Sequence, residues 1–279
     1  MSLASDVFSG FSLSRTGAMV LRYLYLLRSS WPRLAELVYW PAVQMLTWGF
    51  LQTYISGQAG AVGMSGRLAV AAGTLVGALL LWDTMFRAQL GFSVSFLEEM
   101  WSRNMGNLLM SPLRPLEFVA ALMTMSVIRL AIGIIPVSIL ALVFFGFNLW
   151  SLGLALVAFF VNLVITAWAI GLVVAGLVLR NGMGAEALAW SVLFFLMPFA
   201  CVYYPVSTLP EWLQWIVWRL PPTYVFEGLR AALVGHVFRA DLMIDALAIN
   251  LGLLVVGAFV FLKLLDSARS AGSLLQMGE

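Results

Sequence analysis

Six long apolar stretches make up most of this chain, and its few charged residues lie mainly in the gaps between them. Hydrophobic residues are 62% of the 279 residues and charged residues only 10%, which is too little charge to cover the surface of a water-soluble protein. The stretches are continuously apolar rather than alternating, so they predict helices and not the strands of a barrel. The expected fold class is therefore all-α, a polytopic membrane protein with six transmembrane helices.

The positions of the spans follow from their length, since a helix needs roughly 20 mostly apolar residues to cross the hydrocarbon core. The six predicted spans are residues 37–54, 68–92, 118–145, 152–179, 187–204 and 242–265. They form one transmembrane domain, residues 36–268, between an N-terminal region (1–35) and a C-terminal tail (269–279).

Basic residues predict the orientation, because Lys and Arg favour cytoplasmic loops. One side of the predicted topology receives Arg15, Arg22, Arg28, Arg33, Arg87, Arg103, Arg114, Arg180, Lys263 and Arg269, and the other only Arg67, Arg219, Arg230 and Arg239. Both termini are therefore predicted to be cytoplasmic. This distribution explains the net charge of +2 without a nucleic-acid surface.

Several kinds of chemistry lack their residues in this sequence. Cys201 is the single cysteine and His236 the single histidine, so no disulfide framework or clustered metal site is expected. The only lysine, Lys263, does not stand in a phosphate-binding glycine loop. We expect no catalytic residues, no metal and no cofactor bound by this chain.

Two regions on the predicted cytoplasmic side differ from plain spans. Residues 13–33 combine arginines with leucines at helical spacing and predict an amphipathic helix along the membrane interface, either a simple anchor or a moving gate. Residues 96–117 are the longest connection, predicted as a helical extension, a turn at Gly106 and Asn107, and a restart near Pro112. This connector is either a contact for a soluble partner or a plain solvated link. The candidate residues are Arg15, Arg22 and Arg28 in the first region and Glu98, Glu99, Arg103, Gly106, Asn107, Ser111 and Pro112 in the second.

On the predicted outer side, residues 203–239 contain prolines that divide an apolar segment into two helices too short to span. They predict a re-entrant hairpin over residues 205–235, and the spacing of Glu227 and Arg230 predicts an ion pair within its second helix. The candidate residues of this region are Pro205, Pro210, Pro221, Pro222, Tyr224, Glu227 and Arg230.

Charged residues also occur inside the predicted spans. Asp83 and Arg129 lie at similar depths when counted at ~1.5 Å per residue from the cytoplasmic ends of spans two and three. Because an unpaired charge at such a depth is costly, they are predicted to form an ion pair, with Arg87 as an alternative partner for Asp83.

The loop motifs in this arrangement resemble those of ABC-2 type transporter permeases. The resemblance rests on the connector with Ser111-Pro112-Leu113, on Tyr204-Pro205-Val206-Ser207 and Leu209-Pro210, and on Leu220-Pro221-Pro222-Thr223-Tyr224 followed by Glu227-Gly228-Leu229-Arg230. It covers nearly the whole chain, although Pro221-Pro222 stands where many relatives have Asn-Pro.

This resemblance implies the membrane subunit of an exporter, without ATPase activity of its own. It implies a dimer with a second copy or a similar permease, and a separate cytoplasmic ATPase that binds ATP and Mg. The connector (residues 96–115) would couple to the ATPase, residues 13–33 would form a gate helix, and spans two and five would line the path through the inner membrane. An amphipathic, lipid-linked or drug-like cargo suits apolar walls. An ion-coupled carrier and a membrane-embedded lipid-modifying enzyme remain as alternatives.

Overall fold

The computed structural model describes residues 11–61 and 67–270, and within them every regular element is a helix. This confirms the all-α prediction. Residues 1–10 of the predicted N-terminal region and 271–279 of the predicted C-terminal tail lie outside the described residues. The elements are α2 (Leu13–Arg28), α3 (Trp31–Ala61), α4 (Arg67–Trp101), α5 (Met105–Met110), α6 (Pro115–Phe145), η1 (Leu149–Leu152), α7 (Leu154–Asn181), η2 (Gly182–Ala185), α8 (Leu188–Leu196), η3 (Val206–Thr208), α9 (Glu211–Val217), α10 (Pro221–Val234) and α11 (Ala240–Ser270).

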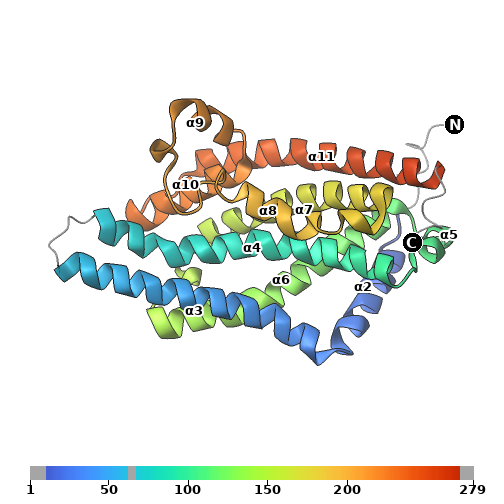
Figure 1. Cartoon of the computed structure of the whole chain (residues 1–279), viewed down its shortest axis with the longest axis horizontal. Coiled ribbons are helices and arrows are strands. Elements are labelled where there is room, and N and C mark those ends of the chain that lie inside the picture. Colours follow the sequence, from blue (N-terminus) through green and yellow to red (C-terminus); the bar gives the residue numbers. More distant parts are fainter. Residues whose placement is uncertain (1–10, 62–66, 271–279) are drawn as a thin grey trace.

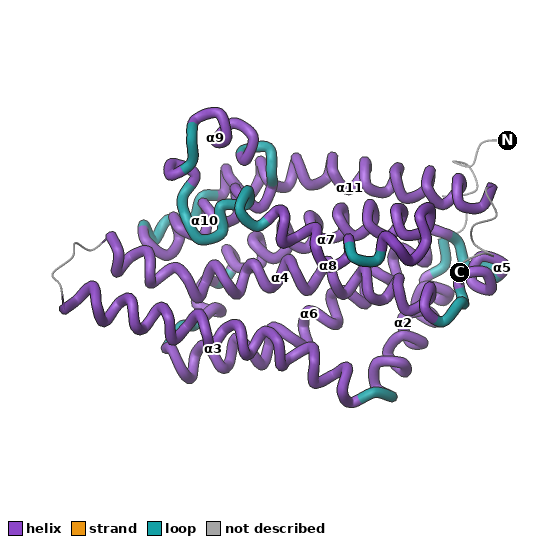
Figure 2. The backbone as a smooth tube through the Cα atoms, in the orientation of Figure 1, coloured by secondary structure: helices purple, strands orange, loops and turns teal. Residues whose placement is uncertain are grey.

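The long helices lie side by side along one axis of an elongated bundle (Figures 1 and 2). The short helix α5 lies at one end, together with the start of α2 and the last turns of α11. The short helices α9 and α10 lie toward the opposite end. We refer to these as the α5 end and the α9 end of the bundle.

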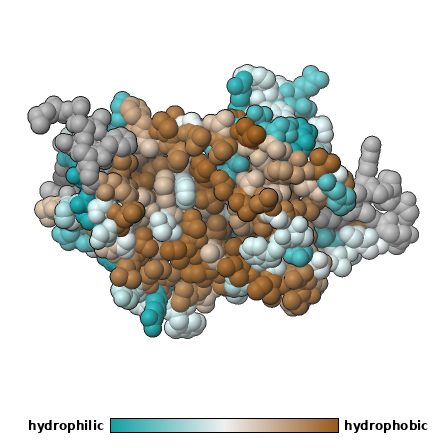
Figure 3. All heavy atoms as spheres, turned by 180° about the vertical axis from the view of Figure 1, so that it is seen from behind, coloured by the Kyte–Doolittle hydropathy of each residue, from teal (hydrophilic) through white to brown (hydrophobic). Residues whose placement is uncertain are grey.

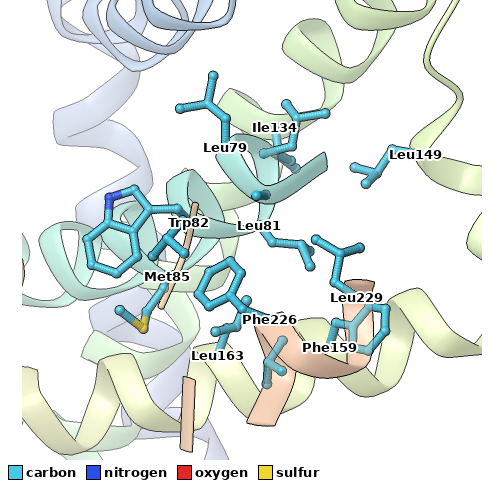
Figure 4. Close-up of a cluster of buried hydrophobic side chains, with 14 of the residues drawn as sticks. Leu79, Leu81, Trp82, Met85, Ile134, Leu149, Phe159, Leu163, Phe226 and Leu229 are labelled. Atoms are coloured by element: carbon cyan, nitrogen blue, oxygen red, sulfur yellow. The ribbon is translucent and has the colours of Figure 1, made fainter. Parts of the chain in front are cut away.

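Helix α4 occupies the middle of the bundle and packs against α3, α6, α7, α8 and α10. Its approach to α6 is close because Gly91 has no side chain: a Cβ there would lie 3.0 Å from the Cα of Ser126. Toward the α9 end, side chains of α4, α6, α7 and α10 meet in a buried apolar cluster that includes Trp82, Phe159 and Phe226 (Figure 4). This cluster fixes the half-length α10 against the long helices.

The surface of the bundle is that of a membrane protein. A broad hydrophobic band covers its middle, and hydrophilic residues gather toward the ends (Figure 3). In the described part of the chain, three helices are long and apolar enough to cross a membrane, namely residues Pro115–Phe145, Leu154–Ala185 and Ala240–Ser270. The predicted spans at 118–145, 152–179 and 242–265 overlap these three helices, but the full set of six is not confirmed. The predicted spans at 37–54 and 68–92 lie within the long helices α3 and α4.

The fifth predicted span, residues 187–204, is wrong as a continuous helix. Helix α8 has only 9 residues, which is about 14 Å at ~1.5 Å per residue, and turns follow from Met197 to Tyr204. Pro198 explains the early end, since it has no N–H to donate to the carbonyl four residues earlier, although Met197 before it keeps helical backbone angles. The span therefore ends before Pro205 and Pro210, where the sequence had suggested its end.

Candidate functional site

A cleft of about 560 Å³ lies between α3, α4 and α8, with one residue contributed by α6. Aromatic side chains come from all three helices, and charged side chains come from α3, α4 and α6. The aromatic lining residues are Trp40, Phe86, Trp101, Trp190 and Phe194, and the charged ones are Arg33, Glu36, Asp83, Arg87, Glu98 and Arg129. The cleft thus combines an apolar wall with two separate groups of charges.

The first group is an ion pair within α4 that also reaches α3. Nε of Arg87 lies 2.6 Å from Oδ2 of Asp83, one helical turn earlier, and both side chains are largely buried. Nη1 of Arg87 donates a hydrogen bond of 2.8 Å to the carbonyl oxygen of Leu37 in α3. Gly133 of α6 makes room for this contact, because a Cβ there would lie 2.9 Å from the Leu37 oxygen and 3.1 Å from Cδ of Arg87.

The second group consists of two arginines around one carboxylate. Nη2 of Arg129 lies 3.0 Å and 2.9 Å from the two carboxylate oxygens of Glu98, and Nη1 of Arg33 lies 3.3 Å from Oε1. Arg129 is only 6% exposed, and its Nε is buried without a hydrogen-bond partner in the described part of the chain. Because one carboxylate faces two guanidinium groups, this cluster has a surplus positive charge.

The predicted ion pair between Asp83 and Arg129 is therefore wrong, while the alternative partner Arg87 is correct. Side chains on a helix lean toward its N-terminus. Helices α4 and α6 run in opposite directions, so the side chain of Asp83 leans toward the α9 end and that of Arg129 toward the α5 end. The two backbones are also not at equal depth, because Gly91 of α4 lies against Ser126 of α6, which places Arg129 nearer the α5 end than Asp83. The side chain of Arg129 therefore reaches Glu98 instead.

The connector between α4 and α6 turns earlier than predicted. Gly106 and Asn107 lie inside α5, and the chain turns at Arg103, whose φ is 52°. The N–H of Arg103 donates to the carbonyl of Met100 and that of Asn104 to the carbonyl of Glu99, both at 3.0 Å. This is the usual left-handed helix ending, but with arginine where glycine is common, so no residue pattern indicated it.

Two buried carboxylates fasten α2 to the two sides of this connector. Glu99, at the end of α4, accepts hydrogen bonds from Nη1 of Arg22 and from Nδ2 of Asn104. Glu117, in the first turn of α6, accepts from the Arg15 guanidinium at 2.8 Å and 2.5 Å and from the backbone N–H of Ser12. The hydrogen bond to Glu117 also raises the pKa of Arg15. Neither carboxylate has any exposed surface.

The candidate connector residues therefore divide into three groups. Glu99 is buried, and the Glu98 side chain is only 9% exposed. Gly106 and Ser111 are half-buried. The exposed members are Arg103, Asn107 and Pro112, next to Met110, which is 81% exposed. Among the candidate connector residues, this exposed group is the most accessible to another protein.

Comparison with protein-family models identifies the family of this helical bundle. The model described as ABC-2 type transporter matches residues 24–234, from the middle of α2 to the last residue of α10. The chain belongs to the ABC-2 type transporter family. It is thus a membrane-embedded permease component of an ABC-type transporter, a family of transport components without an ATPase of their own. A comparison with curated proteins finds no match.

The family match includes the α9 end of the permease, where the predicted pair between Glu227 and Arg230 is confirmed at 3.0 Å. Oε1 of Glu227 also accepts from the N–H of Val206 at 2.7 Å, and Nη1 of Arg230 donates to the carbonyl of Cys201 at 3.0 Å. The pair therefore holds the loop after α8 against α10. Among the other candidates, Pro205 precedes η3, Pro210 precedes α9, Pro221 and Pro222 open α10, and the Tyr224 hydroxyl donates to the carbonyl of Trp218. Re-entry of α9 and α10 into the membrane stays a prediction.

Several residues that shape this permease were not found from the sequence. No sequence pattern around Gly133 or Leu37 indicates their contacts with Arg87. Arg33 counts in the sequence only as one of the basic residues before span one, so its contact with Glu98 was not predicted. Glu117 follows Pro115 in the first turn of α6, where an acidic residue is common, so its ties to α2 were not foreseen. In the described ranges, no three His, Cys, Asp or Glu side chains are grouped as metal ligands would be.

Proposed function

We propose that this permease is the membrane half of an exporter that uses ATP hydrolysed by a separate cytoplasmic ABC ATPase, which binds the ATP and Mg. It works as a dimer with a second copy of itself or a similar permease, in the inner membrane, with the α5 end and both termini in the cytoplasm. Its cargo is amphipathic, lipid-linked or drug-like. The family match supports the transport role, and the internal contacts below support the mechanism.

The observation that carries this proposal is the set of carboxylates at the connector. Glu98, Glu99 and Glu117 stand on the two helices that α5 joins, and they bind arginines of α2, α3 and α6. Buried charged contacts of this kind resist separation, because each broken pair leaves an uncompensated charge. A push on α5 therefore moves α2, α3, α4 and α6 together, and α3 and α4 are two walls of the cleft.

The cleft supplies the transport step in this proposal. Its walls come from α3, α4 and α8, which correspond to predicted spans one, two and five. Displacement of α3 and α4 relative to α8 opens or closes it, and alternation between the two arrangements moves cargo across the membrane. Aromatic and charged linings side by side suit a molecule with an apolar body and a polar end.

Co-purification tests the coupling at the exposed connector. The permease carrying Arg103→Glu and Asn107→Glu is compared with the unchanged chain for co-purification of a soluble ABC ATPase from its native membrane, and for ATP-dependent export from vesicles. We expect loss of both, with normal insertion. Arg219→Glu is the matched control, since this arginine is exposed at the α9 end and, in the proposed topology, on the other side of the membrane.

Two results would contradict the proposal. Full retention of the ATPase and full export in the double variant would remove the connector from coupling. Uphill transport by the permease alone, driven by an ion gradient in vesicles that lack the ATPase, would favour the ion-coupled carrier instead.

A further inference from the structure

We propose that the cleft binds the anionic end of an amphipathic molecule, a carboxylate or a phosphate, between Arg33 and Arg129, with the apolar body of the molecule along the aromatic wall. The inference rests on the proposed function in treating this cleft as the place where cargo is held. It adds the charge of the cargo, which neither the family nor the fold specifies.

The six charged side chains of the cleft sum to zero, but the charge around Glu98 alone favours an anion. Arg33 and Arg129 share the single carboxylate of Glu98, which leaves one positive charge without a counter-charge. The other group in the cleft, Asp83 with Arg87, is neutral as a pair. A second negative group beside the arginines would neutralise this cluster, and Arg129 is buried, where an uncompensated charge is costly.

The hydrogen-bond donors of Arg129 point to the same conclusion. Only Nη2 of this guanidinium contacts Glu98, and its Nε is buried with no acceptor in the described part of the chain. A buried donor without an acceptor destabilises the structure, because the group has lost its hydrogen bond to water. Carboxylate and phosphate oxygens match the planar guanidinium, which binds them through two parallel hydrogen bonds. A ligand oxygen would thus provide the Arg129 guanidinium with an acceptor that the described part of the chain does not provide.

The remaining free carboxylate of the cleft, Glu36, has an exposed side chain and no partner among the described residues. Water screens an exposed charge effectively, so its repulsion of a bound anion is weak compared with the attraction of a buried arginine. The carboxylate of Glu36 could instead attract a cationic ligand bound to the aromatic wall. The experiment below therefore includes a cation.

The aromatic wall gives the ligand its apolar part. The rings of Phe86 in α4 and Phe194 in α8 pack edge to face with centroids 5.3 Å apart, and Trp40 of α3 is 56% exposed along the same cleft. Leu90 and Val94 continue the apolar surface of α4 toward Glu98. An alkyl or aromatic body that lies on this wall places its charged end at the two arginines.

Photolabelling of the purified permease in phosphatidylcholine nanodiscs, without ATPase or nucleotide, tests the inference. Three probes share one diazirine-bearing alkyl chain and end in a carboxylate, an uncharged amide or an amine. Labelling is mapped to α3, α4 and α8 and divided by labelling of α11, whose exposed Leu251, Val255 and Phe259 report simple partition into lipid. We expect the carboxylate to exceed both other probes in this ratio by roughly fivefold or more.

Arg33→Gln should remove most of this preference without disturbing the fold, because the Arg33 side chain is 51% exposed. Arg180→Gln is the matched control, an exposed arginine outside the cleft, and should leave the preference intact. Equal ratios for acid and amide, a preference for the amine, or an unchanged preference in Arg33→Gln would each overturn the inference. Displacement of the carboxylate probe by an equimolar amount of inorganic phosphate would overturn the amphipathic part, since the apolar body would then add nothing to binding. Failure of ATP-driven export would sink the proposed function but leave this binding result standing.

Discussion

Nη1 of Arg87 lies 2.8 Å from the carbonyl oxygen of Leu37, and this carbonyl is the one that α3 itself leaves without a donor. In an unbroken helix it would accept from the N–H four residues later, but that residue is Pro41, which has none. Arg87 of α4 therefore replaces a missing hydrogen bond of α3. Asp83 holds the guanidinium in place from the preceding turn.

This relationship predicts that the cost of losing Arg87 depends on Pro41. Arg87→Met leaves Asp83 without its partner in any background, but it leaves the Leu37 carbonyl unsatisfied only when residue 41 is proline. We expect Arg87→Met to lower the free energy of unfolding in both the unchanged chain and a Pro41→Ala chain. The loss in the Pro41→Ala chain should be smaller by about 1–3 kcal/mol, which is the cost of one unsatisfied buried acceptor. Unfolding in mixed micelles of the four chains measures this difference. Equal losses in both backgrounds would show that the bond to Leu37 contributes nothing.

The second prediction concerns the partner of Arg129. Removing one member of a buried ion pair costs roughly 3–5 kcal/mol, because the other charge stays buried and unpaired. Glu98→Gln and Arg129→Gln should each destabilise the permease strongly, and the double variant should lose much less than the sum. The matched cycle with Asp83→Asn and Arg129→Gln should be additive. A coupling energy between Asp83 and Arg129 as large as that between Glu98 and Arg129 would contradict the observed pairing.

The contrast between these pairs shows what the sequence could and could not predict. Continuous apolar segments defined five helices correctly, and the helical spacing of Glu227 and Arg230 was enough to predict their contact, since both stand on one helix. Asp83 and Arg129 stand on different helices, so their contact depends on which way each side chain leans, and a count of residues from the membrane surface carries no such information. Pro198 shows a different limit. Pro41 and Pro136 lie inside long helices, whereas α8 ends just before Pro198, and sequence alone does not tell which proline a helix accommodates.

The third prediction concerns the left-handed turn at Arg103. A residue other than glycine pays about 1 kcal/mol or more in this conformation, whereas glycine adopts it freely. Arg103→Gly should therefore keep or raise the melting temperature, and Arg103→Val should lower it, because a β-branched side chain fits this region poorly. Thermal unfolding of the purified permease measures both. If Arg103→Gly preserves stability yet weakens ATPase retention, the arginine side chain itself belongs to the docking surface. A valine variant as stable as the glycine variant would contradict the turn geometry.

The last prediction concerns the fastening of α2. Glu117 accepts hydrogen bonds from the backbone N–H of Ser12 and from the Arg15 side chain, so its carboxylate holds the first turn of α2 against α6. Glu117→Gln removes the negative charge and at least one of these bonds, and charged hydrogen bonds are each worth about 1.5–3 kcal/mol. We expect amide hydrogen exchange in residues 13–18 to become roughly tenfold faster or more, while exchange in α7 and α11 stays unchanged. Asp266→Asn, an exposed carboxylate near the end of α11, is the control and should alter neither region. Unchanged protection of α2 in the Glu117 variant would show that apolar packing of Met19, Tyr23 and Leu27 holds this helix without the carboxylate.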